Sequence, residues 1–130
     1  MDKKIKSHFF NLYCMAIADG NVAPKELEQL YKIGSDYYGV SPEEIQEVVF
    51  STDITLYKPE TKEEKIILLY DLALIAWADG GIDEGEKELL EKFAVRFDVS
   101  YNQIKTLVEF LLENAKQNVS HEELLKKLSK

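Results

Sequence analysis

Apolar residues recur at helical spacing along most of the chain and predict an all-α protein. In segment 2–18, Ile5, Phe9 and Leu12 fall on one face, with the three-to-four-residue spacing of an amphipathic helix. Segment 66–78 differs, because it is apolar on nearly every side and Asp71 is its only charged residue. A helix that is apolar all round is buried. We therefore expect segment 66–78 at the centre of a helical bundle.

Start and stop signals divide the chain into about seven helices. Serine, threonine or aspartate stands three positions before glutamate in segments 41–44, 61–64, 83–86 and 120–123, which is the capping-box pattern of a helix start. Segment 100–103 predicts a further cap, and Pro24 suits the first helical position. Gly39 is expected to end the helix that begins at Pro24, and Gly34 on its apolar side indicates close contact with another helix. The predicted helices begin near residues 2, 24, 42, 62, 84, 101 and 121.

The first half of the chain resembles the second half. Segments 9–50 and 69–112 form an internal repeat, and segment 51–60 reads as the linker between them. We expect a single domain over residues 1–130, folded as a compact bundle. Two three-helix units related by a pseudo-twofold axis, plus a C-terminal helix, would form this bundle. The repeat is clearest where Ala16, Ala18, Asp19, Gly20 and Glu26 recur as Ala76, Ala78, Asp79, Gly80 and Glu86.

Each copy of the repeat places two carboxylates at the elbow between helices. The elbows look like the second half of a calcium loop, but apolar residues such as Ile75 and Trp77 occupy the positions of the earlier ligands. A regular EF-hand is therefore excluded. Helix capping is a sufficient reason for Asp83 and Glu86 to be acidic. Two alternatives remain for the aspartates that precede the elbow glycines.

In the first alternative these aspartates accept hydrogen bonds from backbone amides and set the elbow angle. In the second, the carboxylates of both elbows meet across the pseudo-twofold axis and bind calcium, magnesium or manganese, since hard cations need six or more oxygen ligands. No cofactor is certain from the sequence. The candidate metal ligands are Asp19, Glu26, Asp79, Asp83 and Glu86.

Composition excludes several classes of partner. The net charge of −8 disfavours nucleic acid, whose binding rests on lysine and arginine. No apolar run is long enough for membrane insertion. Cys14 is the single cysteine, so no intrachain disulfide can form, and this suits a cytoplasmic location. We expect Cys14 to be a small buried residue. His8 and His121 lack companions at ligand spacing and are expected at the surface.

The pattern A-D-G-x-[VI]-x-x-x-E occurs at residues 18–26 and again at residues 78–86. In an acidic, all-helical chain this pattern resembles the TerB-like family, which includes tellurite-resistance protein TerB and related helical domains. The resemblance extends from about Phe9 to Leu112. It implies a compact helical fold, a cytoplasmic location, no established enzymatic activity and a link to resistance against tellurite, phage and other stress. It also implies metal binding by the motif acids, although Ala23 stands where the second copy has Asp83.

The leading hypothesis is a non-enzymatic interaction module whose acidic elbows dock a protein partner or hold a cation weakly. The alternative is a metal-dependent hydrolase built on the same duplicated carboxylates. An enzyme needs a pocket in which the acids converge, whereas an adaptor needs an exposed apolar or charged patch. The sequence also leaves a homodimer open.

Overall fold

The computed structural model describes residues 3–16, 24–51, 57–78 and 80–128. Over these residues the chain forms α-helices and one π-helical turn, with no strand, which confirms the all-α prediction. The expected helix at segment 2–18 is described only from Lys3 to Ala16. The elements are α1 (Lys3–Ala16), α2 (Pro24–Ile33), the π-helical turn η1 (Gly34–Tyr38), α3 (Pro42–Val49), α4 (Lys62–Trp77), α5 (Glu84–Arg96), α6 (Tyr101–Lys116) and α7 (His121–Leu128).

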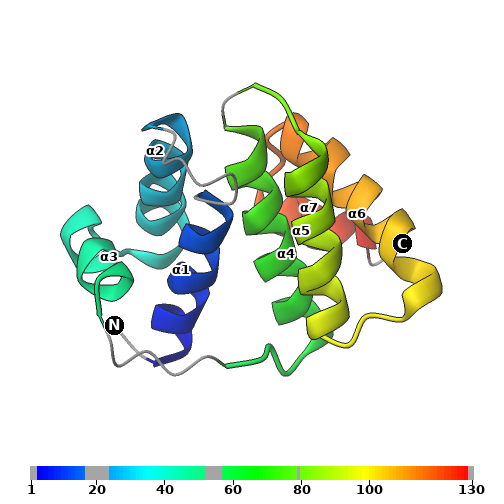
Figure 1. Cartoon of the computed structure of the whole chain (residues 1–130), viewed down its shortest axis with the longest axis horizontal. Coiled ribbons are helices and arrows are strands. Elements are labelled where there is room, and N and C mark those ends of the chain that lie inside the picture. The colour runs from blue at the N-terminus through cyan, green and yellow to red at the C-terminus, as the bar shows by residue number, and fades with distance from the viewer. Residues whose placement is uncertain (1–2, 17–23, 52–56, 79, 129–130) are drawn as a thin grey trace.

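Helix α4 lies at the centre of the bundle, as its sequence predicts. It packs against α1 and α2 on one side and against α5 and α6 on the other. Figure 1 shows α2 and α3 beyond α1, and α5 and α6 beyond α4. Ten of the 16 residues of α4 are buried. Because neighbours surround the helix, an apolar side chain is favourable at nearly every position along it.

In each half of the chain the first helix contacts the two helices that follow it, and the internal repeat itself stays a prediction. In the first half α1 contacts α2 and α3, and in the second half α4 contacts α5 and α6. Helices α1 and α2 also contact α4, so the two halves share one core. The pseudo-twofold relation between the halves stays a prediction. Of the linker 51–60, residues 52–56 lie outside the described residues.

Most of the predicted caps are present. Ser41 and Glu44 form a full capping box, as do Asp83 and Glu86. The Thr61 hydroxyl accepts a hydrogen bond from the Glu64 amide at 3.1 Å. These side chains satisfy backbone N–H groups that have no partner inside the helix. These helix starts could be predicted from the sequence because each cap is a hydrogen bond between residues three positions apart.

The predicted cap at Ser100 is wrong. The Ser100 side chain makes no capping hydrogen bond. Instead the Gln103 amide donates to the backbone carbonyl of Ser100 at 2.8 Å. A tight turn of this i to i+3 kind satisfies the same amide, so α6 begins at the expected place without a side-chain cap.

The end of the second predicted helix widens into a π-helical turn. Gly34 begins η1, and Gly39 ends it with a positive φ of 62°, which glycine adopts readily. A Cβ at Gly34 would lie 2.8 Å from Cδ1 of Ile45 on α3. The predicted close contact is thereby confirmed. The turn also carries Tyr37 and Tyr38, and the ring of Tyr38 packs against that of Phe9 on α1. π-helical turns are frequent at functional sites.

Candidate functional site

The centre of the bundle contains a buried carboxylate. Asp71 lies midway along α4 and has no exposed surface. Removing an ionised carboxylate from water is unfavourable by several kcal/mol unless hydrogen bonds and opposite charges replace the water. The surroundings of Asp71 therefore have to supply donors.

Three side chains from three other elements supply these donors. Nε2 of His8, on α1, lies 2.8 Å from Oδ2 of Asp71. The Tyr38 hydroxyl, at the end of η1, donates to the same oxygen at 3.0 Å. Nε2 of His121, at the start of α7, lies 2.6 Å from Oδ1. We call His8, Tyr38, Asp71 and His121 the Asp71 cluster.

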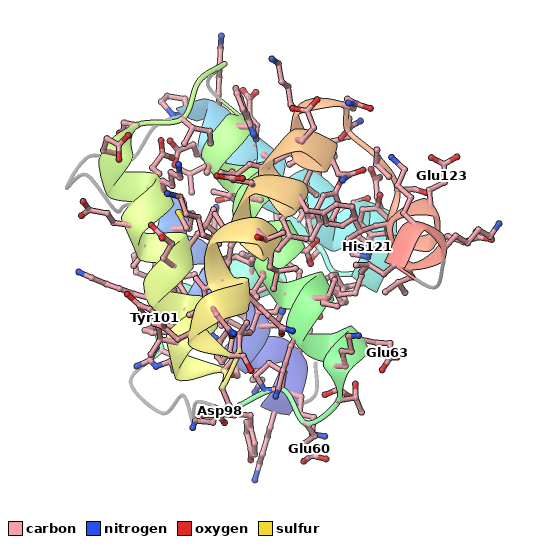
Figure 2. The ribbon with its side chains drawn as sticks, turned by 90° about the vertical axis from the view of Figure 1, so that its right-hand side faces the viewer. Glu60, Glu63, Asp98, Tyr101, His121 and Glu123 are labelled. Atoms are coloured by element: carbon pink, nitrogen blue, oxygen red, sulfur yellow. The ribbon has the colours of Figure 1, made fainter. Side chains whose placement is uncertain are left out.

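The view in Figure 2 shows how α7 takes part in the cluster. His121 lies on the side of α7 that faces the bundle, whereas Glu123, two residues later, points outward. The side chain of His121 is only 15% exposed. The first residue of a short terminal helix is thus held to the central helix by a charge-assisted hydrogen bond, which is stronger than a neutral one.

A tyrosine next to Asp71 holds the chain that leads to His121. The Tyr70 hydroxyl donates to the carbonyl oxygens of Asn114 at 3.2 Å and Val119 at 2.5 Å. The Asn114 carbonyl lies in the last turn of α6, and the Val119 carbonyl lies in the connection between α6 and α7. Since Tyr70 and Asp71 are neighbours on α4, one helix turn anchors both the connection and the first residue of α7. The ring of Tyr37 stacks on the other side of His121, with 3.7 Å between centroids.

The charge state of Asp71 determines which nitrogen of each imidazole must carry a proton. Burial alone would raise the pKa of Asp71, but the hydrogen bonds from His121 and His8 and the charges of these rings outweigh burial and lower the pKa below 3.8. An ionised carboxylate only accepts hydrogen bonds. Each imidazole therefore carries a proton on Nε2, and Nδ1 is the ring nitrogen left for other partners.

Tyr38 is a neutral donor in the cluster. Burial, the charge of Asp71 and the hydrogen bond to it together raise the pKa of Tyr38 well above its ordinary value. The hydroxyl therefore keeps its proton at physiological pH. It also lies 3.1 Å from Nε2 of His8, so a single hydroxyl contacts two members of the cluster.

The prediction that His8 and His121 lie at the surface is wrong. Their side chains are 13% and 15% exposed, and both bind Asp71. The prediction considered only spacing to other metal-binding side chains. A better signal was Asp71, the single charge in an apolar helix, because a buried carboxylate needs cationic or donor partners. The sequence offers only two histidines, and both serve this role.

A cavity of about 350 Å³ adjoins the cluster between α1 and α4. His8 and Tyr38 contribute to its wall, so the cluster is accessible from one side. Its volume falls within the range of small-molecule pockets. Much of the rest of the wall is apolar. The other lining residues that the structure describes are Lys4, Ile5, Ser7, Asn11, Tyr57, Lys58, Pro59, Glu63, Glu64, Ile67 and Leu68.

The structure describes three of the five acidic residues predicted at the elbows. Asp19 and Asp79 lie outside the described residues. Glu26 and Glu86 are each 5% exposed and lie in the first turns of α2 and α5. Asp83 is exposed, and its Oδ1 accepts a hydrogen bond from the Glu86 amide at 2.7 Å. The capping interpretation of Asp83 and Glu86 is thus confirmed.

A metal site at the elbows stays a prediction. Within the described parts of the chain, no group of three or more histidine, cysteine, aspartate or glutamate side chains is placed to hold a metal ion. Of the five predicted ligands, Asp83 and Glu86 lie next to each other in the structure. Their contact is the capping box at the start of α5.

Cys14 is partly buried on α1. Burial raises the pKa of its thiol, against a smaller opposing effect of the charge on Arg96. A thiol with a raised pKa is less often the reactive thiolate. This agrees with a packing role for Cys14, as the sequence predicts.

The free energy of unfolding should decrease as the pH is lowered below about 4, because Asp71 is ionised in the folded chain. Its folded pKa lies below the ordinary 3.8, so its contribution is complete above the unfolded pKa and is lost as pH falls through the folded pKa. Urea unfolding of wild type and Asp71→Asn at about pH 5 and about pH 2.5 measures this. The wild type should lose more stability than the variant over this interval. Equal losses would mean that folded Asp71 is not ionised.

Comparison with known proteins yields no relative. No protein-family model matches the chain, and neither the curated proteins nor the solved structures contain a match. Among the described residues, no helix combines the length and the apolar character needed to cross a membrane.

Proposed function

We propose that this chain is a non-enzymatic TerB-like domain that acts in resistance to tellurite and related stress by binding a protein partner. The repeated pattern at residues 18–26 and 78–86 supports the family. The all-helical bundle with a buried central helix fits the fold that the family implies. A cytoplasmic location is part of the same proposal.

The exposed acidic start of α5 is the observation that carries the docking role. Asp83, Glu84 and Glu88 are exposed in its first two turns, and Lys87 there is half-buried. The net charge of the whole chain, −8, is also negative. A concentrated field of one sign attracts a partner of the opposite sign and speeds encounter. The partner surface would therefore be basic.

Growth on tellurite tests the proposed function. The gene would be deleted in its own host and restored as wild type or as the triple variant Asp83→Asn, Glu84→Gln, Glu88→Gln. Asparagine still caps a helix, so the triple variant should fold and melt like the wild type. We expect resistance to return with the wild type but not with the triple variant. Resistance that is unchanged by the deletion would contradict the proposal, and full rescue by the triple variant would contradict the docking surface.

Calorimetric titration of calcium, magnesium and manganese separates docking from cation binding at the elbow. The variant Glu86→Gln keeps an oxygen that can accept from the Asp83 amide, now at 3.3 Å, but loses the charge. A capping role predicts no heat of metal binding for either protein. Heat with the wild type that disappears in Glu86→Gln would instead assign a cation site. Turnover of a phosphate ester only with that metal would favour the hydrolase alternative.

A further inference from the structure

Asn11 is a buried amide in the wall of the cavity between α1 and α4. The residue is 4% exposed and lines this cavity. Among the described residues its side chain makes no hydrogen bond, and its polar atoms keep contact with the solvent in the cavity. One carbonyl oxygen and one NH₂ group are therefore available to a molecule inside the cavity.

His8 presents a second polar group to the same cavity. It precedes Asn11 by three positions on α1, so both side chains lie on one face of the helix. Asp71 and Tyr38 engage Nε2 of His8, which leaves Nδ1 as the nitrogen that a ligand can reach. Nδ1 accepts a hydrogen bond when the ring is neutral and donates one when the ring is protonated. The inner wall thus combines an imidazole nitrogen with an amide that both donates and accepts.

Apolar side chains and balanced charges define the rest of the cavity. Ile5, Ile67 and Leu68 contribute to the wall beside the polar groups. At the rim, Lys4 pairs with Glu60 at 3.5 Å and Lys58 pairs with Asp98 at 3.6 Å. Figure 2 shows Glu60 and Glu63 near the start of α4. The carboxylates of Glu63 and Glu64 also line the cavity, but both residues are exposed, so water screens their attraction for a cation. An anionic ligand would lose its hydration without gaining an unpaired lysine, so the cavity favours a neutral ligand.

We propose that this cavity is a binding site for a small, neutral, mainly apolar molecule that carries a carboxamide or lactam group. The ligand carbonyl would accept from the Asn11 NH₂ group. The ligand N–H would donate to the Asn11 carbonyl, and the apolar part would lie against Ile67 and Leu68. This site is separate from the acidic start of α5 and does not rest on the proposed docking function.

Three probes that share one ring test the chemical class. Benzamide, benzoate and benzylamine would be titrated at millimolar concentration into the ¹⁵N-labelled full chain, with amide chemical shifts recorded by NMR. We expect saturable shifts at His8, Asn11, Ile67 and Leu68 with benzamide, at about tenfold higher affinity than with either charged probe. The absence of saturable shifts at these residues would overturn the proposal. Equal or tighter binding of a charged probe would also overturn it.

The variant Asn11→Leu tests the role of the amide. Leucine has a similar volume, and the substitution removes no hydrogen bond within the described chain, so the variant should fold. We expect benzamide affinity to fall about tenfold. The exposed Asn102 on α6 supplies the matched control Asn102→Leu, which should leave the affinity unchanged. Unchanged affinity in Asn11→Leu would mean that the amide contacts only water, and the proposal would fail.

Discussion

Replacing Asp71 by alanine is expected to lower the free energy of unfolding by about 3–5 kcal/mol. The substitution removes the acceptor that His8, Tyr38 and His121 share, and it leaves three largely buried donors without this partner. Unsatisfied donors in a buried site lose their hydration without compensation. Urea unfolding followed by circular dichroism at neutral pH measures the difference.

The matched control for this prediction is Asp98→Asn. Asp98 is an exposed aspartate with a φ of 64°, a conformation that asparagine tolerates well. Its removal should change stability by no more than about 0.5 kcal/mol. A loss of similar size in both variants would refute the special role of Asp71. If Asp71→Ala does not fold, Asp71→Asn retains one acceptor oxygen and should give a smaller, measurable loss.

The network also predicts coupling between distant elements. The double variant Asp71→Ala, His121→Ala should lose less free energy of unfolding than the two single variants lose together, because the two residues act through the same hydrogen bond. Additive effects would show that α7 is held by its other contacts alone.

Replacing Phe9 by alanine should lower the free energy of unfolding by about 3–5 kcal/mol. Phe9 has no exposed surface. Its ring meets those of His8 and Tyr38 edge to face, with centroids 5.7 Å and 5.3 Å away. The loss combines the transfer of the ring into water with the cavity that remains beneath the Asp71 cluster.

Phe50→Ala is the matched control for the phenylalanine, since Phe50 is 78% exposed. We expect its effect on the free energy of unfolding to be within about 0.5 kcal/mol. Because Phe9 packs under the Asp71 cluster, Phe9→Ala should also shift the NMR signals of the His8 and His121 rings. A small stability loss with unchanged ring signals would contradict the packing described for Phe9.

Local patterns in the sequence were sufficient for most of the fold. The caps at Ser41 and Asp83 could be predicted because both partners of each hydrogen bond lie within four residues. The buried position of α4 could be predicted because no face of it is polar. Ser100 shows the limit of such reasoning, since the helix satisfies the same amide with a backbone carbonyl instead of the side chain.

The candidate site could be predicted only in part. The elbow acids stand out because they repeat, and Asp83 and Glu86 prove to be caps. The Asp71 cluster has no such pattern. Its hydrogen bonds join residues separated by 63, 33 and 50 positions, and each partner by itself is an ordinary residue of its own helix.

The sequence by itself determined that this protein is a helical bundle around a buried helix, because apolar periodicity and caps act over a few residues. It also determined that Asp71 needs partners, since burying a charge without them is unfavourable. The tertiary structure decided that those partners are His8, Tyr38 and His121, because contact between distant helices depends on which faces pack together. The same packing placed Asn11 in the wall of the cavity between α1 and α4.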